Sequence, residues 1–150
     1  MTPFVTGGAG FLLAVLWFDL MFDVQVLRNR GRDLPEDVLV SLSDYYRRVT
    51  TGARPMNRLI AATMLATTAA VGVQIARGDA PRWAGWASLA LVLAPVALAS
   101  VRTVPDAVRL GARGESTDRQ SARARSICRD HLLCLAAITS LLVVQLAFAR

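Results

Sequence analysis

Four long apolar runs constrain this chain more than any other feature of its 150-residue sequence. Each run holds about 18 or more residues, which at about 1.5 Å of rise per helical residue is enough to cross about 30 Å of hydrocarbon. Within a bilayer the backbone must satisfy its own hydrogen bonds, so runs of this length form helices. The sequence therefore predicts an all-α protein, a four-helix transmembrane bundle that forms a single integral-membrane domain over residues 1–150. The predicted spans cover residues 4–27, 57–76, 83–101 and 127–149.

The composition agrees with a membrane protein and argues against a nucleic-acid-binding one. Hydrophobic residues make up 54% of the chain and fall in blocks, whereas globular proteins usually hold about 45–50%. The formal net charge of +6 comes from arginines beside the apolar spans, without the basic and aromatic surface that nucleic acid requires. The lipid bilayer is the expected partner. The absence of lysine in an Ala- and Val-rich chain is typical of GC-rich bacteria, which predicts the bacterial inner membrane.

The arginines also predict how the chain is oriented in the membrane. They gather in the connections between spans one and two and between spans three and four, whereas the short second connection carries only Arg77 and Arg82. Positively charged connections stay in the cytoplasm. The first and third connections are therefore expected on the cytoplasmic side, with both termini outside.

The first connection is predicted to contain a short amphipathic cytoplasmic helix. Pro35, Glu36 and Asp37 favour a helix start, and apolar residues then recur at spacings of three and four. Such a helix lies on the membrane interface or caps the bundle. The segment Tyr45-Tyr46-Arg47-Arg48 could bind lipid phosphates or cover the mouth of the bundle, although an ordinary interfacial helix is the simpler interpretation. The apolar positions are Val38, Leu39, Leu42, Tyr45, Tyr46 and Val49.

Three further local patterns lie in the second half of the chain. Pro95 falls inside the third span and is expected to kink it. A brief helical extension over 105–110 is expected to stop at Gly111. Thr117-x-x-Gln120 matches a capping box, so the fourth helix is predicted to start well before the membrane.

Small and polar residues predict where helices meet. Gly7, Gly8 and Gly10 would let a neighbouring helix approach the first span closely. Ala62, Ala66 and Ala70 form a stripe of small residues on the second span. Gln74 and Gln145 could pair between helices, whereas Thr63, Thr67 and Thr68 are expected to bond back to their own helix. Cys128 and Cys134 are expected to be free thiols.

Asp19 and Asp23 are the most unusual residues of the first span. At helical spacing they share one face, about 6 Å apart along the axis. A charge within a membrane helix is costly and normally faces a partner, a protein interior or a watery cavity. Counted inward from the outer span ends, Asp23 falls at one depth with Arg58, Arg102 and His131, and Asp19 lies about one turn deeper.

This polar layer allows a structural and a functional interpretation. Asp23 could pair with Arg58 or Arg102 and simply staple the bundle. The functional hypothesis assigns Asp19 and His131 as the candidate catalytic pair. It also gives the layer a ligand-binding role, with the candidates Asp23, Asn57, Arg58, Arg102, Asp106 and Arg129.

His131 is the only histidine of the chain. Together with Asp19 and Asp23 it could hold iron, manganese or copper, but no second histidine completes the usual facial triad. Alternatively, His131 and an aspartate could transfer a proton beside a bound ligand. No cofactor can be assigned from the sequence.

Three segments together support a resemblance that covers most of the chain in layout. The layout resembles that of small, largely uncharacterised bacterial four-helix membrane proteins and, more distantly, the anthrone-oxygenase-like family. The distant resemblance implies oxidation of a polycyclic aromatic substrate, with His131 among the functional residues. The segments are Phe18-Asp19 with Asp23, Arg54-Pro55-Met56-Asn57-Arg58, and Arg129-Asp130-His131-Leu132-Leu133.

Three hypotheses of function follow, and the sequence does not decide whether the protein is an enzyme. In the first, a polar pocket at the cytoplasmic leaflet binds, and in its extended form oxidises, a hydrophobic aromatic or quinone-like molecule. In the second, the protein is a non-catalytic accessory or structural subunit that meets copies of itself or a membrane complex. The third is proton-coupled transport by an oligomer.

Overall fold

The computed structural model describes residues 1–149, with only the backbone described at Arg54, and these residues are helical apart from short connections. No strand occurs among them, and four long helices are apolar enough to cross a membrane. The predicted all-α four-helix bundle is therefore confirmed, and the chain is a multi-pass integral membrane protein. The long helices are α1 (Thr2–Arg28), α3 (Arg54–Arg77), α6 (Thr117–Phe148) and the continuous run of α4 (Arg82–Leu98), η2 (Ala99–Thr103) and α5 (Val104–Ala112). The connection from α1 to α3 contains α2 (Glu36–Arg47) and the π-helical turn η1 (Arg48–Gly52).

The outside of the bundle is apolar, as a lipid-facing surface requires. In the most apolar 18-residue stretch of each span, only 17% to 28% of the residues are buried within the protein. Large side chains such as Phe4, Leu65, Val101 and Leu146 are more than two-thirds exposed. A soluble monomer rarely leaves so much apolar surface uncovered. The hydrocarbon of a bilayer is the medium that matches it.

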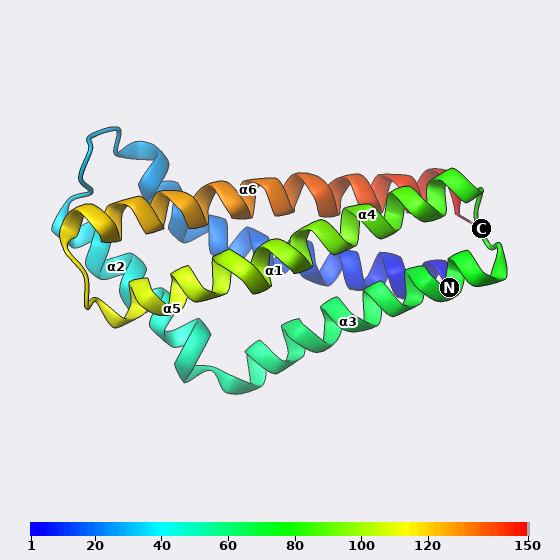
Figure 1. Ribbon diagram of the computed structural model, residues 1–150, viewed down its shortest axis with the longest axis horizontal. Helices are drawn as coiled ribbons and strands as arrows, with labels where there is room; N and C mark the ends of the chain where they lie inside the picture. The colour runs from blue at the N-terminus through cyan, green and yellow to red at the C-terminus, as the bar shows by residue number, and fades with distance from the viewer. Residues whose placement is uncertain (150) are drawn as a thin grey trace.

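The four spans pack as a ring in which each touches two neighbours. Helix α6 packs against α1 and α4, and α3 closes the ring by packing against the same two helices. Figure 1 shows α3 diverging from the other helices towards the end of the bundle that carries α2 and α5. We call this end the cap end, and we call the opposite end, where the α3–α4 connection lies, the turn end.

The contact between α1 and α3 depends on Gly8. A Cβ atom at Gly8 would lie 2.0 Å from Thr67 Oγ1, whereas Gly7 and Gly10 have no such neighbour within 4 Å. Only Gly8 of the three glycines therefore sits at the close helix contact. Thr67 is buried and its hydroxyl has no hydrogen-bond partner among the described residues, so the expected bond back to its own helix is wrong there. Thr68 does make this bond, to the Met64 carbonyl at 2.8 Å.

Polar side chains tie the four spans together at the turn end. Gln74 Nε2 donates to Gln145 Oε1 at 3.0 Å, and Gln145 Nε2 donates back to Gln74 Oε1 at 3.1 Å. Gln145 Nε2 also donates to Ser88 Oγ at 2.9 Å, and Gln74 Nε2 lies 3.4 Å from Thr2 Oγ1. The predicted glutamine pair is confirmed, and it joins α3 to α6.

The helix boundaries differ from the sequence predictions in the second half of the chain. The third span was predicted to end at residue 101, but its helix continues past Pro95 and through the π-helical turn η2 as far as Ala112. A π turn commonly accommodates a local irregularity within a continuing helix. The helix then stops at Arg113, which adopts a left-handed conformation with φ 51°, instead of at Gly111.

The early start of the fourth helix, near Thr117, is confirmed, but the predicted capping box is wrong. Ser116, and not Thr117, is the N-cap residue, and it makes no side-chain cap. Gln120 Nε2 instead donates to the Glu115 carbonyl at 2.6 Å. Arg123 binds the Glu115 carboxylate and holds this carbonyl near Gln120.

The helix predicted in the first connection is confirmed as α2, which begins after Pro35. Its apolar face packs on α1, α5 and α6, so it caps the bundle. The loop before it is fixed as well, because the backbone N–H of Leu34 donates to Ser121 Oγ at 2.9 Å. The buried cap cluster comprises Val26, Leu34, Val38, Leu39, Leu42, Tyr46, Ala107, Leu110, Ala124, Ile127 and Cys128.

Gly111 allows α2 to dock on α5. A Cβ atom at this position would lie 2.9 Å from the backbone nitrogen of Arg47 and 3.1 Å from its Cα atom. We expect Gly111→Ala to lower the free energy of unfolding by about 1–3 kcal/mol through overpacking, partly offset by the better helix propensity of alanine. Unfolding of the purified protein in detergent micelles measures this effect.

The matched control is Gly114→Ala, because no atom lies within 4 Å of a Cβ there. Equal stability of the two variants would contradict the close contact between α2 and α5.

Candidate functional site

The candidate site lies at the cap end, where α1, α2 and α6 meet. Asp19 and Asp23 project from α1 towards His131 on α6. The side chain of Asp23 is 1% exposed, that of His131 9% and that of Asp19 17%. The shared depth predicted for Asp23 and His131 is therefore confirmed, and Asp19 stands beside them.

Asp23 is fully engaged by two partners on different helices. Its Oδ2 lies 2.7 Å from His131 Nδ1, and its Oδ1 accepts a hydrogen bond from the Tyr46 hydroxyl at 2.5 Å. A buried carboxylate is stable only when it is paired and hydrogen-bonded. The pairing of Asp23 with Arg58 or Arg102, considered from the sequence, is therefore replaced by His131 and Tyr46.

Asp19 is only half engaged. Its Oδ1 accepts a hydrogen bond from the Tyr45 hydroxyl at 2.6 Å. Its Oδ2 lies 3.8 Å from His131 Nε2, which is too far for a hydrogen bond. Asp19 Oδ2 and His131 Nε2 are not among the fully buried polar atoms that lack a hydrogen-bond partner. The gap between Asp19 and His131 is thus the open part of the cluster.

The two tyrosines are the members of this cluster that sequence reasoning assigned least well. They are the only tyrosines of the chain, and both hydrogen-bond a carboxylate of α1. Tyr45 also stacks on Phe22, with ring centroids 3.9 Å apart and planes 13° apart. Covering the bundle mouth was one of the roles considered for this segment, and the docking of α2 gives Tyr45 and Tyr46 that position. The available signal was two adjacent tyrosines on the apolar face of an amphipathic helix.

The same contacts shift the acidity of both phenols. Burial, followed by the charge of Asp23, raises the pKa of Tyr46 well above its usual value of 10.0. Burial and the charge of Asp19 raise the pKa of Tyr45 in the same way. Both hydroxyls therefore remain protonated donors over the physiological pH range.

A second polar cluster lies next to the first. Asp130 is completely buried and accepts hydrogen bonds from Arg102, with Nε at 2.8 Å, and from the Thr103 hydroxyl at 3.2 Å. Consecutive residues on a helix point about 100° apart, so Asp130 faces η2 while His131 faces α1. Arg102 is therefore occupied by Asp130 and does not reach Asp23.

The other candidate ligand-binding residues do not gather around Asp19 and His131. Asn57 Nδ2 donates to the Thr50 carbonyl at 2.6 Å and holds the start of α3 to η1. Asp106 pairs with Arg123. Arg58 and Arg129 are exposed.

The cluster does not form the three-ligand metal site considered from the sequence. Asp23 and Asp19 face different nitrogens of the His131 ring, so the three side chains do not converge on one point. Among the described residues, no group of three His, Cys, Asp or Glu side chains is arranged to hold a metal ion. Cys128 and Cys134 are free, as expected.

Two hollows of the described residues lie away from the cluster. One hollow of about 350 Å³ lies between α1 and α3, lined by residues including Gly8 and Thr67. Another of about 620 Å³ lies at the α3–α4 connection. Neither is lined by Asp19, Asp23 or His131.

Comparison with protein-family models, curated proteins and solved structures found no match for this chain. The resemblance to the anthrone-oxygenase-like family stays a prediction. The candidate site rests on its geometry.

The raised tyrosine pKa values predict the alkaline behaviour of the protein. The native state holds the phenol protons more tightly than the unfolded state does. The contribution of the two tyrosines to the free energy of unfolding is therefore fully present below pH 10 and falls as the pH rises above that value. We expect tyrosinate absorbance near 295 nm to stay absent in the folded protein at pH values where a free phenol ionises. Since Tyr45 and Tyr46 are the only tyrosines, the signal reports on them alone, and ionisation at the usual value would contradict their burial against Asp19 and Asp23.

Removing the two hydroxyls in turn should have unequal effects. Tyr46→Phe leaves the buried Asp23 without one donor, and we expect the free energy of unfolding to fall by about 1–3 kcal/mol. Tyr45→Phe is its matched control, with a smaller loss, because Asp19 is reachable by solvent. Chemical unfolding in micelles compares them, and an equal or reversed order would show that Asp23 does not depend on Tyr46.

Proposed function

We propose that this protein binds a hydrophobic aromatic or quinone-like molecule at the cap end and exchanges a proton with it through His131. The observation that carries the proposal is the contact of the buried Asp23 with Nδ1, which leaves Nε2 directed towards the largely buried gap beside Asp19. A carboxylate on one ring nitrogen fixes the tautomer and raises the basicity of the other. This is the arrangement of a general acid or base.

The gap between His131 and Asp19 suits one oxygen atom of a ligand. A ligand oxygen about 2.8 Å from Nε2, beside Asp19 Oδ2, would make one hydrogen bond of ordinary length to the ring. A ligand hydroxyl there could pass its proton to Nε2, which leaves a ligand oxyanion and an imidazolium stabilised by Asp23. Tyr45, already bonded to Asp19, would hold the carboxylate in place.

The surroundings of the gap favour an aromatic ligand that arrives from the bilayer. Phe22 stacks on Tyr45 beside Asp19, and Trp17 and Phe18 on the same helix are more than half exposed. Ring faces of this kind pack well against a flat hydrophobic molecule. Arg102, first considered as a holder of polar substituents, is assigned to Asp130 instead.

The cluster supplies proton chemistry, and the family resemblance adds oxidation of the bound molecule. Because none of these side chains is an electron acceptor, an oxidant such as dioxygen would have to come from outside. We therefore propose binding with proton transfer as the core function, and oxidation as its extension.

We also propose that the cap end faces the cytoplasm of a bacterial cell, in its inner membrane. The connections at this end carry most of the arginines, whereas the α3–α4 connection carries Arg77 and Arg82. This distribution is typical of the cytoplasmic side of a membrane protein. The ligand would then meet the site at the inner leaflet.

A structural role is the second candidate, and the satisfied contacts of Asp23 favour it. Asp23, Tyr46 and His131 complete one another without any ligand, as a staple between α1, α2 and α6 would. In that case the protein would serve as an accessory subunit, and Asp19 would be a peripheral part of the staple.

A binding experiment separates the two candidates. Protein in nanodiscs is titrated with anthrone and with 2-methyl-1,4-naphthoquinone, and binding is followed by calorimetry. Loss of a charged hydrogen-bond partner should weaken binding by about tenfold or more in Asp19→Asn and His131→Gln. Asp19→Asn should keep the thermal stability of the wild type, because Asp19 is only half engaged.

The matched control is Asp37→Asn, which removes an exposed carboxylate from α2 and should bind like the wild type. Absence of binding of either probe to the wild type, or equal binding by all variants, would reject the ligand site. A large loss of stability in Asp19→Asn would favour the staple.

A further inference from the structure

The hollow at the turn end is unrelated to the polar cluster and has two cationic side chains in its wall. It measures about 620 Å³ and lies where α3 ends and α4 begins. Arg77, the last residue of α3, and Arg82, the first of α4, line it together with Trp86. Ile75 and Ala80 contribute apolar surface. The lining of the hollow therefore combines two cationic side chains with apolar surface.

Both arginines are free to bind an anion. Arg77 and Arg82 are exposed, and neither forms a salt bridge with the side chains that the structure describes. Asp79, the nearest carboxylate in the sequence, lies 3.6 Å from the Met1 amino nitrogen instead. Guanidinium groups present planar pairs of donors that match phosphate oxygens. Two of them on one hollow favour a phosphate group.

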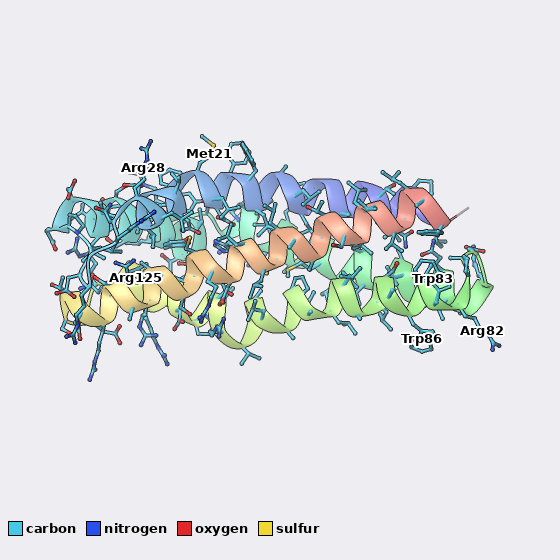
Figure 2. All side chains as sticks on the ribbon, turned by 90° about the horizontal axis from the view of Figure 1, so that it is seen from above. Met21, Arg28, Arg82, Trp83, Trp86 and Arg125 are labelled. Atoms are coloured by element: carbon cyan, nitrogen blue, oxygen red, sulfur yellow. The ribbon has the colours of Figure 1, made fainter. Side chains whose placement is uncertain are left out.

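The depth of the hollow in the membrane favours a lipid as the carrier of that phosphate. Trp83 and Trp86 are 54% and 61% exposed, and exposed tryptophans at span ends lie at the headgroup level. Figure 2 shows both residues and Arg82 on the same helix at this end of the bundle, with Arg82 and Trp86 pointing outward on the same side. Trp83 also packs edge-on against Phe148, with centroids 4.7 Å apart, which fixes the level of α6.

We propose that this hollow binds one anionic phospholipid, with the headgroup phosphate between Arg77 and Arg82. The glycerol and the upper acyl chain lie on the apolar wall formed by Ile75, Ala80 and Trp86. A free phosphate ion would use the arginines but gain nothing from that wall. The mixed lining therefore selects a lipid.

Native mass spectrometry of the full chain in detergent tests this assignment. The protein is equilibrated with phosphatidylglycerol or phosphatidylcholine, and the bound lipid is counted. We expect the wild type to retain phosphatidylglycerol preferentially, and the double variant Arg77→Gln/Arg82→Gln to retain one molecule fewer. The control Arg28→Gln/Arg30→Gln removes the same charge from exposed positions at the cap end and should keep the molecule at the turn end.

A label on the lipid tells the turn end from the cap end. In a Trp17→Phe/Trp83→Phe background, the remaining Trp86 should be quenched by brominated phosphatidylglycerol. The apparent affinity for the brominated lipid, measured by this quenching, should fall about tenfold when Arg77 and Arg82 are replaced. It should stay unchanged in the cap-end control.

Three outcomes would overturn the proposal. The first is equal loss of lipid in both double variants, which would indicate general charge attraction. The second is equal retention of phosphatidylcholine. The third is displacement of the lipid by millimolar inorganic phosphate, which would identify an ion site without a lipid wall.

Discussion

A carboxylate buried among membrane-spanning helices needs a partner from another helix, and the contact of Asp23 with His131 meets that need. Leaving such a group unpaired would cost several kcal/mol, roughly as much as a small bundle can lose. The contact fixes the rotation of α6 relative to α1, because His131 and Asp23 must face each other. It also makes the position of Tyr46, and hence of α2, part of the same arrangement.

Polar contacts hold the two ends of the bundle in different ways. The cap end uses charged groups, with Asp23 on His131 and Asp130 on Arg102. The turn end uses neutral amides, with Gln74 paired to Gln145. Between them the contacts are apolar, and lipid competes with those because it is equally apolar. The polar pairs at both ends therefore set the register of the four spans.

Much of the fold could be predicted from the sequence, because span length, hydropathy and helix starts are local properties. The spans and the start of α2 after Pro35 followed in this way, whereas the pairing of Gln74 with Gln145 followed from two amides near the same end of two apolar spans. The partners of Asp23 did not, because counting residues gives depth but not rotation about the helix axis. Arg102 lay at the right depth, yet η2 and the fourth span direct it to Asp130. The capping box at Thr117 failed because Ser116 is the N-cap residue and Gln120 donates to the Glu115 carbonyl instead.

The sequence predicted the α1 and α6 residues of the candidate site, but it did not assign the α2 residues to it. Asp19, Asp23 and His131 stand out as polar groups in apolar spans. The roles of Tyr45 and Tyr46 depend on how a connecting helix docks, which no local pattern specifies. Residues outside the site, such as Asn57 and Asp106, were selected by depth alone and serve the local contacts of the cap.

Tyr45 and Tyr46 are neighbours on one short helix, and each holds a different carboxylate. A rigid helix cannot withdraw one of them far without moving the other. Undocking of α2 would therefore break both hydrogen bonds in a single cooperative step and admit water to both aspartates at once. Wetting of the two aspartates and detachment of α2 are therefore thermodynamically linked.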